Sequence, residues 1–113
     1  MEAPACVVAG EPFTVRVTVR NTGTRAGREV VQVYLARPGS AVERPVRWFG
    51  GYAAVRAEAG RTAGAEVVVG PRALRHWSEA DRCWATEPGP YRLMVGRSAG
   101  DTRWEGEVTV GGP

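Results

Sequence analysis

The chain has 113 residues, a length that suits one domain with a modest core. Its apolar share of 43% and its mixed charges argue against disorder. The net charge is +3, but the basic residues, all of them arginine, are scattered along the chain. Nucleic-acid binding, which needs basic residues gathered on one face, is therefore not expected. No stretch has the length and hydropathy of a membrane span, so no membrane partner is expected either.

The first half of the chain predicts strands with one buried face. A short strand is expected near residues 6–8, and apolar residues then alternate over 13–21 and 29–37. The expected buried sets are Phe13, Val15, Val17 and Val19 in the first of these and Val31, Val33 and Leu35 in the second. Gln32 and Tyr34 lie on the opposite face of the second strand, a polar but uncharged face that another domain could cover.

The second half continues the pattern after a proline-bracketed loop over 38–46. Strands are expected over 46–55, where Gly50 and Gly51 indicate a bulge or a close backbone approach, and over 60–70. Residues 71–84 predict a loop with one helical turn. The last strands are expected over 87–97 and 103–110, with Trp104, Val108 and Val110 facing inward. About seven antiparallel strands predict an all-β sandwich of the immunoglobulin or fibronectin type III type.

Catalytic and metal-binding patterns are weak. The acidic pairs Glu79/Asp81 and Glu105/Glu107 are interpreted as surface charge, and His76, the only histidine, is expected to pack beside Trp77. Cys6 and Cys83 fit no metal spacing. They are expected to be buried or idle thiols, with a disulfide between them as the alternative. No phosphate-binding loop is present, so neither a cofactor nor a metal is expected.

Three segments in a fixed order carry a family resemblance. They are NTGTRAGREVVQVYLARPGSAVERPVRWFGGY, AEAGRTAGAEVVV and ALRHWSEADRCWATEPGPYRLMVGRSAGDTR. Together they resemble the fibronectin type III-like domain at the C-terminus of family 3 glycoside hydrolases, the β-glucosidases and their relatives. The match covers about residues 13–110, so residues 1–113 are read as a single domain that is a fragment of a larger glycosidase. Ala59 departs from the family, which prefers proline before Gly60.

The resemblance implies a non-catalytic accessory domain. In the family, the nucleophile and the acid/base belong to the larger preceding domains, and the parent hydrolyses terminal β-linked sugars with retention of configuration. The expected partners are the catalytic domains of the same parent chain, with a homodimer formed through the parent. A docking surface is expected from the strand and loop between residues 32 and 52, comprising Gln32, Tyr34, Arg44, Pro45, Trp48, Phe49 and Tyr52.

Other residues are expected to shape turns. Turn positions are expected at Asn21, Gly23, Gly51, Gly60, Pro88 and Gly89. Tyr91 begins a late strand and resembles the tyrosine corner of sandwich folds, where a buried hydroxyl bonds to the backbone. The rival hypothesis is an independent carbohydrate- or protein-binding module with exposed aromatic residues. Trp48, Trp77, Trp84 and Trp104 are its candidate sugar platform, although Trp48, Phe49 and Tyr52 could equally belong to the core.

Overall fold

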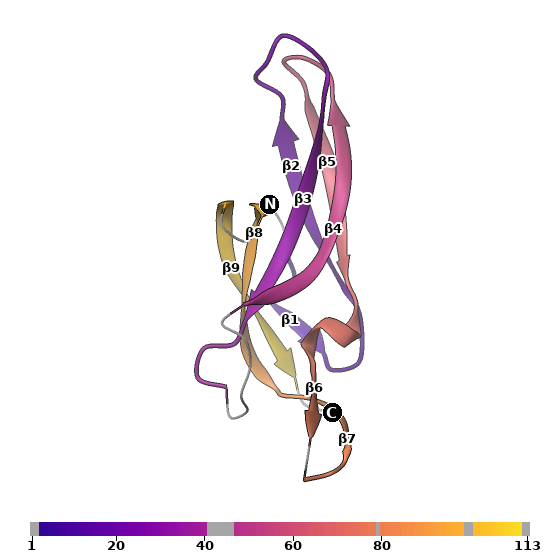
Figure 1. The fold of residues 1–113 in the computed structure, drawn as a ribbon, viewed down its shortest axis with the longest axis vertical. Helices are drawn as coiled ribbons and strands as arrows, with labels where there is room; N and C mark the ends of the chain where they lie inside the picture. Colours follow the sequence, from indigo (N-terminus) through magenta and orange to yellow (C-terminus); the bar gives the residue numbers. More distant parts are fainter. Residues whose placement is uncertain (1–2, 41–46, 79, 99–100, 112–113) are drawn as a thin grey trace.

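The computed structural model describes residues 3–40, 47–78, 80–98 and 101–111. They form an elongated all-β molecule that measures 56 × 25 × 19 Å. Figure 1 shows long strands running to one end and a small hairpin at the other. The elements are β1 (Cys6–Val8), β2 (Phe13–Arg20), β3 (Gly27–Ala36), β4 (Trp48–Ala57), β5 (Thr62–Val69), a 3-10 turn (Pro71–Leu74), β6 (Arg75–Ser78), β7 (Cys83–Thr86), β8 (Gly89–Ser98) and β9 (Asp101–Gly111). In these ranges, no helix has the length and hydropathy needed to cross a membrane.

The strands form two packed layers and a separate hairpin. One layer has the order β1-β9-β8-β3-β4, and the other contains β2 and β5. Neighbouring strands are antiparallel except β1, which runs parallel to β9. The hairpin β6-β7 is a third, two-stranded sheet that projects beyond the layers in Figure 1. The all-β sandwich that the sequence predicts is therefore confirmed.

The core lies between the two layers and matches the alternation in the sequence. Val33 and Leu35 of β3 are fully buried, and so are Val67 and Val69 of β5. The inward residues of β2, β8 and β9 add Phe13, Val15, Tyr91, Leu93, Val95, Val108 and Val110 to the cluster. Val31, Ala65 and Leu74 also belong to it. Burial of these side chains is the main stabilising contribution, at about 1.5–3 kcal/mol for each large one.

The two glycines in β4 have separate roles. The register shifts between Val33 and Tyr34 of β3, so Gly50 has no partner and forms the bulge that the sequence predicts. Gly51 faces the other layer, where a Cβ atom would lie 3.0 Å from the Val68 carbonyl oxygen. Only glycine lets the two backbones approach so closely.

The segment after β5 differs from the prediction. The helical turn over Pro71–Leu74 is present, but a hairpin, β6-β7, replaces the expected loop and raises the strand count from about seven to nine. The hairpin strands have four residues each and little apolar alternation, so periodicity does not reveal them. The turn is closed locally, since the Asp81 amide donates to the Ser78 hydroxyl, and Arg82 adopts a positive φ of 52°.

Candidate docking surface

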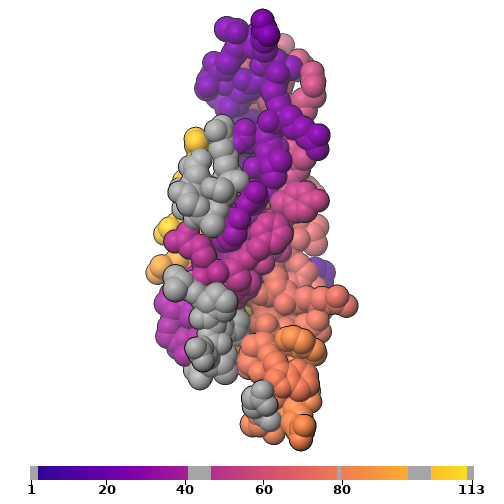
Figure 2. Space-filling view, in the orientation of Figure 1, coloured from indigo at the N-terminus to yellow at the C-terminus, as the bar shows by residue number. Residues whose placement is uncertain are grey.

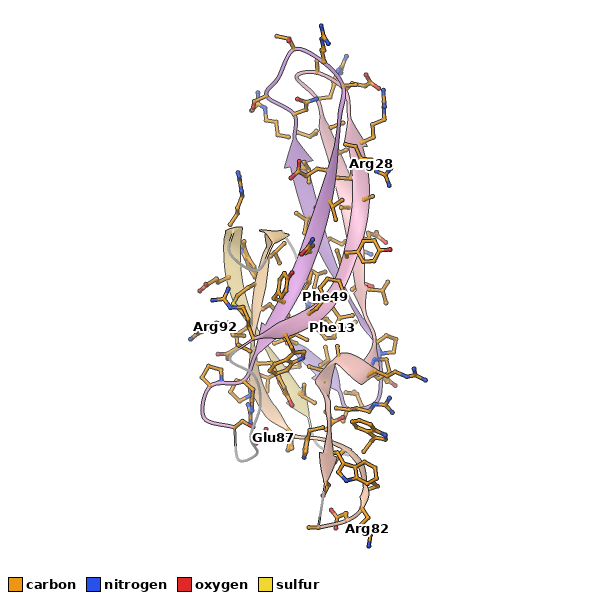
Figure 3. The ribbon with its side chains drawn as sticks, viewed as in Figure 1. Phe13, Arg28, Phe49, Arg82, Glu87 and Arg92 are labelled. Atoms are coloured by element: carbon orange, nitrogen blue, oxygen red, sulfur yellow. The ribbon has the colours of Figure 1, made fainter. Side chains whose placement is uncertain are left out.

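The outer face of β3 and β4 carries an exposed aromatic cluster. Strand pairing places Tyr34 opposite Phe49 and Gln32 opposite Tyr52. The Tyr34 and Phe49 ring centroids lie 5.7 Å apart at a steep angle, and those of Phe49 and Tyr52 lie 6.3 Å apart. Phe49 is 50% exposed and Tyr52 67% exposed. In Figure 2, β4 crosses the middle of the visible face, and Figure 3 labels Phe49 there.

Hydrogen bonding holds this cluster in place from within. The Tyr34 hydroxyl donates to Gln32 Oε1 at 2.5 Å, and both side chains are half-buried. Val30 extends the apolar surface along β3 and is 40% exposed. An exposed surface of large aromatic and apolar groups is typical of an interaction site.

The outer face of the opposite layer has a different character. Thr14, Arg16 and Thr18 of β2 point outward, and Arg16 Nε lies 3.2 Å from Glu66 Oε1 of β5 with both side chains well exposed. Val68 is the large apolar residue on this face. The polar side chains of the β2-β5 face suit contact with water, so the two outer faces of the sandwich differ in polarity.

Trp48 belongs to the core side of β4 and not to this surface. Its indole Nε1 donates to the Ala73 carbonyl oxygen at 2.5 Å, and its ring meets Tyr91 edge to face at 6.4 Å. The hydrogen bond ties the 3-10 turn to β4, which explains why a large polar-tipped ring is needed there. The two interpretations of the aromatic run in β4 therefore divide between residues: Trp48 packs inward, whereas Phe49 and Tyr52 face outward.

Arg37 fixes the base of the loop that follows β3. Its guanidinium donates to the backbone carbonyls of Pro88, at 2.7 Å, and Pro90. Its Nε lies 3.4 Å from Glu87 Oε1, an ion-pair distance without a hydrogen bond, and Ser40 Oγ donates to the same carboxylate oxygen at 2.7 Å. The loop is thus anchored to the turn before β8. Arg44 and Pro45, which the sequence places on the docking surface, lie outside the described residues.

Tyr91 lies at the start of β8 and is fully buried. Its hydroxyl donates to the Glu87 carbonyl oxygen four residues upstream, at 2.7 Å. Gly89, in the intervening turn, has a φ of 113°, and the Arg37 guanidinium lies above the Tyr91 ring at 5.0 Å. This hydrogen bond across the Pro88–Gly89 turn has the form of a tyrosine corner.

Asn21 joins three segments at the far end of the long strands. Its side-chain amide donates to the carbonyls of Arg25 and Ala57, and its Oδ1 accepts from the Gly23 amide at 2.9 Å. Its backbone bonds to both Gly60 and Arg61 in the turn between β4 and β5. Gly60 has a φ of 70°, whereas Gly23 does not adopt a positive φ.

The remaining tryptophans do not form one platform. Trp77 and Trp84 face each other across the β6-β7 hairpin, with ring centroids 5.6 Å apart and planes 79° apart. Trp104 shares the inward side of β9 with Val108, as expected, but it is 37% exposed and is not a core residue. The layers are open at that end of the sandwich. The Trp104 ring lies against Gly106, where a Cβ atom would collide with it.

The candidate chemical groups are placed as follows. Glu105 and Glu107 are exposed on β9, and Asp81 accepts a hydrogen bond from Ser78 in the hairpin turn. Glu79 lies outside the described residues. His76 is half-buried in β6 rather than in a loop. Across the described part of the chain, no group of three or more His, Cys, Asp or Glu side chains could hold a metal ion.

Cys6 and Cys83 are free and exposed thiols, so neither the burial nor the disulfide that the sequence left open is found. They occupy the short strands β1 and β7.

Comparison with known proteins identifies the domain. The model of the fibronectin type III-like domain matches residues 29–99. This chain belongs to that family. "Probable beta-glucosidase I" of Aspergillus fumigatus is 44% identical over 87 residues, which are 76% of this chain and 10% of that protein.

Solved structures agree. A beta-glucosidase from Listeria innocua in complex with glucose superposes with a TM-score of 0.86 and 31% identity, covering 99% of this chain and 15% of that one. DesR, a beta-glucosidase from Streptomyces venezuelae, superposes with a TM-score of 0.82 and 39% identity. The match covers 88% of this chain and 13% of that one. The fibronectin type III-like domain thus spans about a tenth to a seventh of the glucosidases it matches, and by itself it is not their catalytic part.

Proposed function

We propose that this domain is the C-terminal accessory domain of a family 3 glycoside hydrolase, and that it docks on the catalytic domains of its parent chain and stabilises them. The parent would hydrolyse terminal β-linked glucosides. The observation that carries the proposal is the exposed cluster of Tyr34, Phe49 and Tyr52 on one outer face of the sandwich. Aromatic residues of this kind dominate the energetics of protein interfaces.

The inequality of the two outer faces supports one-sided docking. An aromatic face that stayed in water would expose apolar area without benefit, whereas the β2-β5 face, with its Arg16–Glu66 pair, suits solvent. Since relatives are about seven to eight times as long as this domain, most of the parent is available to cover the aromatic face.

The test compares two variants in the full-length parent. Phe49→Ser with Tyr52→Ser should lower the stability of the parent by about 2 kcal/mol or more, because each truncation removes a buried anchor. The matched control is Val68→Ser, which removes an exposed apolar side chain from the opposite face. In the 113-residue chain alone, the double variant should lose only the ring contacts within the cluster, about 0.5–1.5 kcal/mol, whereas Val68→Ser should be neutral within about 0.5 kcal/mol. Equal melting temperatures for the two variants of the parent would refute docking through this face.

An independent sugar-binding module has weaker support. The Trp77 and Trp84 rings are exposed but nearly perpendicular, so they do not form a flat stacking surface, and Trp48 is partly buried against the core. Titration of the chain with cello-oligosaccharides, followed by tryptophan fluorescence, tests this function. Saturable binding that Trp77→Ala abolishes would favour it over docking.

A further inference from the structure

The sandwich has a strand-sized slot at the end where its layers extend unequally. Figure 1 shows β2, β3, β4 and β5 continuing well past the ends of β8 and β9. Strand β3 pairs with β4 from Gly27 to Leu35, but with β8 only from Gln32 to Ala36. Among the described residues, residues 27–31 of β3 therefore pair only with β4, although β8 itself continues two residues past Gly96 to Ser98. Strand β2 likewise pairs only with β5.

A cavity of about 490 Å³ lies between these two free edges. The cavity is lined by consecutive residues of β2 (17–20) and of β3 (27–31). Because successive side chains of a strand point to opposite faces, a lining of consecutive residues indicates that the cavity borders the edges of both strands. Its apolar lining comprises Val17, Val19, Val30, Val31, Val55, Ala57, Val95 and Trp104. Val17, Val19 and Val55 are only half-buried although they point inward, so this part of the core has no covering layer.

The dimensions fit an added strand. Five residues of extended backbone span about 16 Å at a rise of 3.3 Å each. A segment in line with β8 would pair with the free edge of β3 and place alternate side chains on the valines of β2. A free edge that offers both backbone groups and an apolar slot is the setting for β-strand addition.

The charged residues that line the cavity are Arg20, Arg28, Arg103 and Glu29, so its net charge is positive and favours an acidic occupant. Arg28 is exposed on the outer face of β3 beside the slot, and Arg20 lines it from the end of β2. An added strand would set its outward side chains next to Arg28, where opposite charges stabilise and like charges destabilise the pair. A second copy that offered its own free β2 edge would bring Arg16 and Arg20 to this position, which disfavours self-pairing.

We propose that the slot receives an extended segment of the parent chain that is apolar at alternate positions and acidic at those between. The segment would complete the layer where β8 stops and would cover Trp104. This inference rests on the proposed function in one respect: it assumes that the added segment belongs to the same parent chain. The aromatic residues Tyr34, Phe49 and Tyr52 do not line the cavity, although Val30 borders both surfaces.

The test measures residue-resolved amide hydrogen exchange over Gly27–Val31 in the parent. Amides of an antiparallel strand point alternately to its two sides, so an empty slot leaves every second amide fast. An occupied slot should slow those amides by about 100-fold or more relative to the 113-residue chain, because exchange then requires opening of the added strand. Alternating fast and slow amides in the parent would overturn the proposal, whether or not the isolated chain is stable enough to compare.

A charge reversal tests the chemistry of the occupant. Arg28→Glu in the parent should restore at least about tenfold faster exchange at the slot, because it places like charges side by side. Arg61→Glu is the matched control, since it makes the same charge change at an exposed turn that does not line the cavity. Equal effects of the two variants would refute an acidic segment. Protection that appears in the isolated chain and grows with its concentration would assign the slot to a second copy.

The two proposals fail independently. Loss of parent stability in the Phe49/Tyr52 variant with an empty slot would retain docking and reject strand addition. Slow amide exchange at the slot, together with unchanged parent stability in the Phe49/Tyr52 variant, would retain strand addition and reject docking through the aromatic cluster.

Discussion

Replacing Arg37 with methionine should be among the most destabilising changes outside the apolar core. Methionine keeps most of the aliphatic stem but removes the guanidinium. That group binds the carbonyls of Pro88 and Pro90, pairs with Glu87 and lies above the Tyr91 ring. No other residue of the described chain makes this combination of contacts between β3 and the turn before β8.

The magnitude follows from burial. The side chains of Arg37 and Glu87 are only 10% and 13% exposed, so screening by water is limited. Removing one partner of a buried pair costs about 3–5 kcal/mol, because the other charge stays behind. The Ser40 hydroxyl still donates to Glu87, so we expect the lower end, about 3 kcal/mol. For 113 residues the unfolding entropy is about 0.24 kcal/mol/K, which converts this loss to a fall of about 12 °C in Tm.

Urea unfolding of the chain, followed by tryptophan fluorescence, measures the loss. Arg37→Lys should lie between wild type and Arg37→Met, since it keeps a positive charge but cannot reach both carbonyls as a planar fork. Arg92→Met is the matched control on an exposed position of β8 and should change stability by less than about 0.5 kcal/mol. A loss below about 1 kcal/mol for Arg37→Met would show that the pair is not structural.

Three further changes probe the strands and the hairpin. Gly51→Val should cost about 1–3 kcal/mol in urea unfolding, because its Cβ would press on the facing backbone, whereas Gly64→Ala, with open space around it, should be neutral or stabilising; the same sign for both would contradict the close approach. Trp48→Phe should lose about 1–2 kcal/mol with its indole hydrogen bond, measured as a shift in Tm, and an unchanged Tm would show that the bond is not formed. Trp77→Phe should abolish the exciton couplet of the Trp77–Trp84 pair in circular dichroism, and a couplet that survives would contradict their contact.

Alternation explains which parts of the fold could be predicted from the sequence. Strand β2 repeats an apolar residue at every second position, and the residues expected to face inward do so. The Gly50–Gly51 pair likewise marks a real bulge, because a glycine pair inside a strand has few other uses. The β6-β7 hairpin has no such signal. Its strands are short, and its turn is closed by Ser78 and by a non-glycine residue, Arg82, with positive φ.

Whether a residue is buried also depends on its position within the sandwich, which the alternation of apolar residues does not show. Trp104 occupies an inward position of the alternation in β9, but it lies where the opposite layer does not cover it. Alternation shows which face a residue is on and not how far the opposite layer extends. Trp48 and Phe49 are adjacent in sequence and take opposite sides, as strand geometry requires, so three clustered aromatic residues divide between core and surface. Arg37 shows no motif, and its role depends on a turn more than fifty residues away.

The exposed aromatic cluster and the open slot share one physical property: both leave apolar area of this domain uncovered. An isolated sandwich gains nothing from an exposed Phe49–Tyr52 cluster or from valines that face an open slot, since both leave apolar area in water. Each feature becomes favourable when a larger partner supplies the missing surface. Hydrogen bonds from Arg37 at the loop base and from Asn21 at the strand tips join neighbouring segments before any partner binds. Such preorganisation lowers the entropic cost of association, so these hydrogen bonds should contribute to the docking that we propose as well as to folding.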